Sequence, residues 1–123
     1  MSLCILAAGK ATVLAVSAFT LAWTHSVERT EWREEWLVEP AGLRLVEARV
    51  RGSGAGMEPA EDAVLEDGWY VYRPVRPPQA SLLLAASGAT GEGWRLCAAG
   101  ECRPLGALAG EAVEIAPCAG AGP

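Results

Sequence analysis

Two alternating runs of residues constrain this chain more than any other feature. Apolar or aromatic side chains occupy most alternate positions from Phe19 to His25 and again from Trp32 to Val38. A period of two is typical of strands with one buried face. The runs therefore predict an antiparallel hairpin that turns at Glu28 and Arg29, because a slip by one residue would turn one aromatic set away from the other. The facing pairs expected in this register are Phe19 with Val38, Leu21 with Trp36, Trp23 with Glu34 and His25 with Trp32.

This hairpin would place His25, the single histidine, diagonally beside Glu34 on an aromatic face. A carboxylate on an apolar face must be paired to offset its desolvation, so a structural hydrogen bond or ion pair is one interpretation. The other is a ligand-binding or catalytic site in which the carboxylate poises the histidine. The structural interpretation is favoured because no nucleophile is clearly placed beside the histidine, and Ser26 should point to the opposite face of a continuing strand.

A glycine-rich segment, R-G-S-G-A-G-M at 51–57, follows a strand expected at 43–50. Its glycines permit positive backbone dihedrals, and successive amides in such a loop can bind an anion. It is not a phosphate-binding loop, because it lacks the Lys-Ser/Thr ending and has Met57 where a dinucleotide fingerprint has its third glycine. A structural turn or bulge is therefore favoured over a ligand loop. The segment reaches the hairpin's turn only if strand 43–50 pairs with the run 32–38.

Cysteine spacing predicts one disulfide. Cys97 and Cys102 flank A-A-G-E, which is typical of a tight hairpin turning at residues 99–100 and would bring the two cysteines directly opposite each other. A zinc site would need a second such pair or added histidines. Cys4 and Cys118 could pair near the termini, but nothing in their spacing requires it. Disulfides indicate an oxidising compartment.

The remaining chain divides into short strands separated by glycine and proline turns. A hairpin is expected at 3–16, a change of face between Leu45 and Val46 indicates either a bulge or a strand covered on both sides, and prolines 74, 77 and 78 mark a crossover loop. Further strands are expected at 69–73, 81–86, 94–97 and 112–115, and 106–123 is expected to include a frayed C-terminal tail. The prediction is a single all-β domain, residues 1–123, forming an antiparallel β-sandwich or partly open barrel of about eight short strands.

Charge and hydropathy restrict the partners. The 123 residues carry a net charge of −5 without a basic stripe, which argues against nucleic acid. Lys10 interrupts the apolar N-terminal run, leaving it shorter than a transmembrane segment. The residues after it could be interpreted as a signal peptide, but the hairpin interpretation is preferred, so the chain is expected to be a mature soluble domain in which no export signal is evident.

Four motifs carry a resemblance to a family: W-T-H-S-V-E-R-T-E-W-R-E-E-W at 23–36, G-S-G-A-G-M at 52–57, D-G-W-Y at 67–70 and L-C-A-A-G-E-C-R-P-L at 96–105. In this order they resemble small bacterial proteins of unknown function whose genes commonly lie beside those of TAXI-type TRAP transporters. These are tripartite carriers that depend on a substrate-binding protein. The resemblance extends from about Leu3 to Leu105.

The resemblance implies an exported or membrane-tethered accessory protein, facing the periplasm or the cell exterior, whose partner is the membrane or solute-binding subunit of such a transporter. It also implies a polar signature that defines the candidate ligand-binding residues: His25, Ser26, Glu28, Trp32, Glu34 (or Glu35), Gly52, Ser53, Gly54, Gly56 and Met57.

Three functions remain open. The first is a non-enzymatic accessory or binding module of a TRAP-type uptake system. The second is a small hydrolase or metal-dependent enzyme that uses His25 with Glu28 or Glu34, although catalytic zinc usually takes three protein ligands. The third is an interaction domain that adds a strand to a partner. The first is favoured, with no catalytic residue, metal or cofactor expected.

Overall fold

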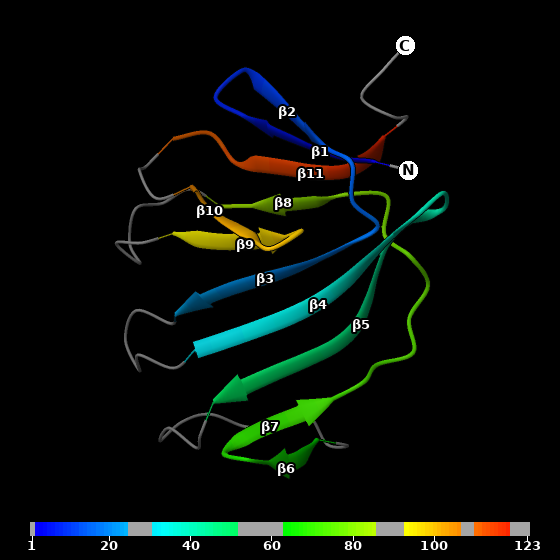
Figure 1. Ribbon diagram of the computed structural model, residues 1–123, viewed down its shortest axis with the longest axis vertical. Helices are drawn as coiled ribbons and strands as arrows, with labels where there is room; N and C mark the ends of the chain where they lie inside the picture. Colours follow the sequence, from blue (N-terminus) through cyan, green and yellow to red (C-terminus); the bar gives the residue numbers. More distant parts are fainter. Residues whose placement is uncertain (1, 25–30, 52–62, 86–92, 107–109, 119–123) are drawn as a thin grey trace.

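The computed structural model describes residues 2–24, 31–51, 63–85, 93–106 and 110–118. Over these residues it is all-β, with eleven strands in two antiparallel sheets (Figure 1). The strands are β1 (Ser2–Ala7), β2 (Lys10–Leu14), β3 (Ala18–Thr24), β4 (Glu31–Glu39), β5 (Gly42–Arg51), β6 (Val64–Glu66), β7 (Trp69–Tyr72), β8 (Leu82–Leu84), β9 (Trp94–Ala98), β10 (Glu101–Leu105) and β11 (Val113–Cys118).

The sheets have the strand orders β2-β1-β11-β8 and β10-β9-β3-β4-β5-β7-β6. They lie in a sandwich-like arrangement that confirms the predicted fold class, and they do not close into a barrel. The described residues hold eleven strands rather than about eight, partly because the three-residue β6 was not expected. β11 also extends to Cys118, three residues beyond the expected strand, because it pairs with β1 along its length.

Two-residue turns form three of the hairpins. Their central residues have positive φ angles: 52° and 77° at Ala8–Gly9, 50° and 85° at Asp67–Gly68, and 53° and 80° at Ala99–Gly100. Two successive positive φ angles define the turn whose twist matches that of the flanking strands. The turn expected at residues 99–100 and the hairpin expected at 3–16 are therefore confirmed, and each turn sets the register of its hairpin.

The register of the β3–β4 hairpin differs from the expected one by two residues. The observed pairs are Phe19–Trp36, Leu21–Glu34 and Trp23–Trp32. This register stacks aromatic rings directly across the strands, with centroids 6.2 Å apart for the first pair and 6.0 Å for the third. A slip by two residues leaves every side chain on its predicted face, which is why the alternation alone could not exclude it. The expected turn at 28–29 lies outside the described residues.

β5 carries both a bulge and a close backbone contact. Trp36 pairs with Leu45 whereas Glu35 pairs with Glu47, so Val46 is an extra residue and the predicted bulge is confirmed. Gly42 has φ +142°, and a Cβ built there would lie 2.3 Å from the Gln79 carbonyl oxygen. Only glycine therefore lets the crossover segment pair with β5, through reciprocal hydrogen bonds of 2.7 and 2.8 Å between residues 43 and 79.

The core lies between the inner faces of the two sheets. The smaller sheet contributes Leu3, Ile5, Leu84, Val113 and Ile115, and the larger sheet contributes residues such as Leu21, Leu43 and Leu96. Burying each of these side chains stabilises the fold by roughly 1.5–3 kcal/mol. The larger sheet extends past the smaller one at β7 and β6 (Figure 1).

Two disulfides each link a pair of neighbouring strands. The predicted Cys97–Cys102 bond joins directly paired residues of β9 and β10, whose Cα atoms are 4.0 Å apart. Cys4 and Cys118, which the spacing left open, join β1 to β11. Two disulfides are consistent with an oxidising location outside the cytoplasm. None of the described segments is a helix that could span a membrane.

Candidate functional site

The structure places two of the predicted ligand-binding residues, Trp32 and Glu34, on the inner face of β4. The other eight lie outside the described residues: His25, Ser26, Glu28, Gly52, Ser53, Gly54, Gly56 and Met57. Trp32 pairs with Trp23 on one side and Val50 on the other. Strand 43–50 therefore pairs with the run 32–38, as the link between the hairpin and the glycine-rich segment required. Thr24, Glu31 and Arg51 all lie at the same end of the sheet.

Three tryptophans cluster at this end of the larger sheet. The Trp23 ring stacks on Trp32 with an interplanar angle of 2°, and it meets Trp94 of β9 at 4.8 Å with a tilt of 55°. Trp94 Nε1 donates a hydrogen bond of 3.0 Å to the Ala85 carbonyl oxygen, which holds the ring in place. Trp32 Nε1 is buried and has no hydrogen-bond partner among the described residues, which is uncommon in folded proteins.

Glu34 is the half-buried carboxyl group next to this cluster. In place of the expected Trp23 it faces Leu21, and its Oε1 accepts a 3.1 Å hydrogen bond from Trp36 Nε1. Burial raises the pKa of Glu34, while the Trp36 hydrogen bond and the positive charge of Arg76 lower it in part. Loss of water around the charged form is the main effect. Glu34 is thus held more readily as a neutral hydrogen-bonding group than an exposed glutamate.

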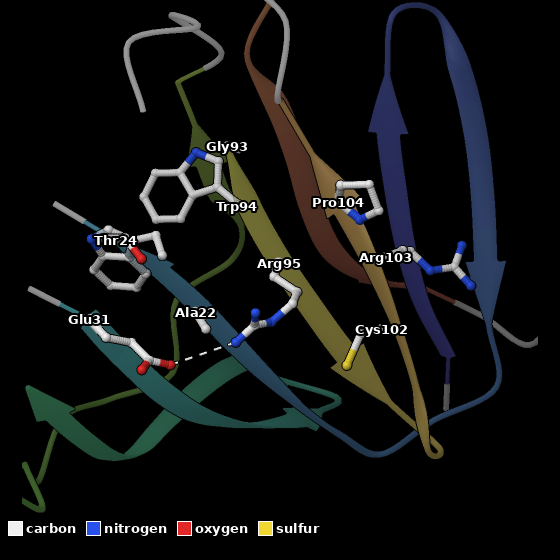
Figure 2. Close-up of a pocket in the computed structure, with 10 residues that line it drawn as sticks. Ala22, Thr24, Glu31, Gly93, Trp94, Arg95, Cys102, Arg103 and Pro104 are labelled. Atoms are coloured by element: carbon white, nitrogen blue, oxygen red, sulfur yellow. Dashed lines mark ion pairs between the residues drawn. The ribbon is translucent and has the colours of Figure 1, made fainter. Parts of the chain in front are cut away.

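A cavity of about 470 Å3 lies against the same end of the sheet, and we call it the β3 cavity. It forms because the outer-facing residues of β3 here, Ala22 and Thr24, are small, whereas Glu31 and Arg95 on the neighbouring strands are long. Its volume is in the range of small-molecule sites. The lining residues are Ala22, Trp23, Thr24, Glu31, Gly93, Trp94, Arg95, Cys102, Arg103 and Pro104 (Figure 2).

An ion pair spans β3 at this cavity. Arg95 of β9 lies 3.6 Å from Glu31 of β4, and Figure 2 shows the two side chains reaching toward each other beside Ala22. Ala22 is only 3% exposed although it is on the outer face. The Arg95 side chain is 53% exposed, so solvent reaches this pair, and such pairs add little to stability. The residues that line the cavity thus include Trp23 and Trp94, whose side chains belong to the inner face, and one positive and one negative side chain of the outer face.

Sequence reasoning missed the cavity residues Glu31, Trp94 and Arg95. They come together because β3 pairs with β9, with Ala22 opposite Arg95, and about seventy residues separate these strands in the sequence. The alternation at 94–97 identifies a strand but not its neighbour. The one sequence clue was that Thr24 and Glu31 lie next to the predicted site residues His25, Ser26 and Glu28 in the sequence.

The described residues contain no group of three or more His, Cys, Asp or Glu side chains that could hold a metal ion. The lining of the β3 cavity offers ion pairing with a carboxylate and a guanidinium, and it includes two tryptophans that can supply apolar contact. Such a site can bind a small amphipathic molecule.

The fold and site define a disulfide-containing, sandwich-like β-protein with a small-molecule-sized cavity at one end of its larger sheet. The model of a protein family, the domain of unknown function DUF1850, matches residues 19–105, and the chain belongs to this family. The match covers nearly all of the larger sheet, together with β8, and includes every residue that lines the β3 cavity. No curated protein and no solved structure matches the chain.

Proposed function

We propose that this protein is a non-enzymatic binding module, periplasmic or at the cell exterior, that holds a small amphipathic solute in the β3 cavity. The observation that carries the proposal is the combination, in one cavity, of Trp23 and Trp94 with the Glu31–Arg95 ion pair. The disulfides support the compartment. The resemblance to proteins encoded beside TAXI-type TRAP transporters supports a role as an accessory to such an uptake system.

The lining suggests the class of solute. A zwitterion can place its ammonium group on Glu31 and its carboxylate on Arg95, replacing the 3.6 Å Glu31–Arg95 pair while Glu31 keeps its 3.0 Å pair with Arg33. An apolar side chain on the same molecule can then extend past the end of the sheet toward Trp23 and Trp94, whose rings lie on the inner face and are already held in position. The proposed solute is therefore an apolar or aromatic amino acid or a molecule with the same groups.

Calorimetric titration of the full chain tests this proposal, with L-phenylalanine, phenylacetate and phenethylamine as probes. L-phenylalanine is expected to bind best because it alone carries both charges. Arg95→Gln is expected to weaken its binding at least fivefold, roughly 1 kcal/mol, which is a modest loss for one charge-assisted hydrogen bond. The matched control is Arg44→Gln, because Arg44 pairs with Glu39 at 2.9 Å on the outer face of the same sheet, outside the cavity.

The proposal fails if none of the probes binds, or if Arg95→Gln binds L-phenylalanine as tightly as Arg44→Gln does. The transporter role needs its own test, in which purified solute-binding and membrane subunits of a TAXI-type TRAP system are mixed with the protein. Association of either subunit supports the accessory role. Absence of association removes that role and leaves solute binding to be judged by the titration.

A further inference from the structure

A second feature lies on the outer face of the larger sheet, where three arginines surround one tryptophan. The guanidinium carbons of Arg33, Arg49 and Arg51 lie 5.3, 5.9 and 5.2 Å from the centre of the Trp69 ring. The strand register produces this group, since Arg33 pairs with Arg49 and Arg51 pairs with Trp69. We call these four residues the Trp69 cluster; none of them lines the β3 cavity.

The carboxylates around the Trp69 cluster do not balance its charge. Glu31 pairs with Arg33 at 3.0 Å but is shared with Arg95. Glu47 pairs with Arg49 and also with Arg73, at 3.0 Å, and Arg73 has a second carboxylate, that of Glu66 opposite Trp69, at 3.8 Å. Arg51 is exposed and has no carboxylate of a described residue within ion-pair distance. Positive charge is thus in local excess on a chain whose net charge is −5.

This arrangement of arginines lowers the stability of the sheet, which a purely structural role would not explain. Arg33 and Arg49 are directly opposite each other, and like charges in that position destabilise a sheet. One tryptophan ring has only two faces for three guanidinium groups, and the attraction between a ring and an exposed cation is weak, so Trp69 does not offset this repulsion. The guanidinium groups nevertheless retain N–H donors in the planar fork that matches a carboxylate or phosphate. An anion bound among them would supply the missing negative charge.

We propose that the Trp69 cluster is a binding site for a small dianion, a dicarboxylate or a phosphate. Arg51 supplies the least compensated charge, and Arg33 and Arg49 supply further donors from the neighbouring positions of β4 and β5. Two negative charges are required because a monoanion would compete for these arginines only as well as Glu31 or Glu47 already does. The Trp69 cluster and the β3 cavity share Glu31, which pairs with Arg33 of the cluster and with Arg95 at the cavity, but no residue of the cluster lines the cavity.

Titration calorimetry of the full chain with succinate, inorganic phosphate and acetate at constant ionic strength tests this inference. Succinate or phosphate is expected to bind saturably and acetate at least tenfold more weakly. Arg51→Ala is expected to lower the dianion's affinity at least tenfold and to keep the fold, because Arg51 is exposed, makes no ion pair with a described residue and is one of three arginines beside Trp69. Arg44→Ala, on the same face of the same strand, is the control and is expected to match the wild type.

Absence of saturable binding by both dianions would overturn the proposal. So would an Arg51→Ala variant that binds them as tightly as Arg44→Ala, since the arginines would then serve only to cover Trp69. A measured preference for acetate over succinate would contradict the requirement for two charges.

Discussion

The two disulfides are expected to differ strongly in what they contribute to stability. Cys4–Cys118 joins residues separated by 114 positions, whereas Cys97–Cys102 joins residues separated by 5. A disulfide restricts the unfolded chain in proportion to the logarithm of the loop it closes. On that basis the long loop contributes about 4.8 kcal/mol and the short loop about 2.1 kcal/mol at 25 °C.

The comparison requires two double variants, Cys4→Ala/Cys118→Ala and Cys97→Ala/Cys102→Ala, each with the other disulfide intact. Urea unfolding under non-reducing conditions, followed by tryptophan fluorescence, gives the free energy of unfolding of each. The first variant is expected to lose roughly 2.7 kcal/mol more than the second, the difference between the two loop terms. Each double variant removes one pair of half-buried or exposed side chains from two paired strands, so the two variants lose similar amounts of packing.

An equal or larger loss in the variant without Cys97–Cys102 would refute the reasoning from loop length. It would mean that the short hairpin, whose turn is already set by Ala99 and Gly100, depends on its disulfide for native contacts. Free-thiol titration of the unreduced wild type provides the accompanying control and is expected to find none of the four cysteines reactive.

Two further predictions concern Glu34 and Gly42. Because burial raises the pKa of Glu34, its contribution to stability is full below pH 4.5 and is lost as pH rises through the raised pKa. Glu34→Gln should therefore raise the free energy of unfolding at pH 7 and raise it less below pH 4.5; an effect that is the same at both pH values in urea unfolding would contradict this. Gly42→Ala should cost more than about 1 kcal/mol, because its Cβ would meet the Gln79 carbonyl at a φ unsuited to alanine. Gly110→Ala, which meets no atom within 4 Å, should cost far less in the same thermal or urea measurement.

Local features of the fold were predictable from the sequence because neighbouring residues determine them. The turn at Ala99–Gly100 fixes the pairing of Cys97 with Cys102, and the change of face at Val46 marks the bulge. Register across the 25–30 segment was not predictable in the same way. Alternation fixes which face Trp32 occupies, but aromatic stacking on Trp23 decides its partner.

Pairing between distant strands accounts for what the sequence could not predict about the site. Arg95 reaches Glu31 only because β9 lies next to β3, and Arg33 meets Arg49 only through the register of β4 and β5. No periodicity in the sequence encodes these neighbours. Trp32 and Glu34 were placed correctly on the inner face, since that assignment needs only a period of two.

The central claim is that the β3 cavity is a binding site, and amide chemical-shift mapping by NMR tests it most directly. The spectrum of the full chain is recorded with and without saturating L-phenylalanine. The account predicts that the largest shifts among the described residues fall on Ala22, Thr24, Trp94 and Arg95. Shifts that are absent there and concentrated on the smaller sheet or on the Trp69 cluster would contradict it.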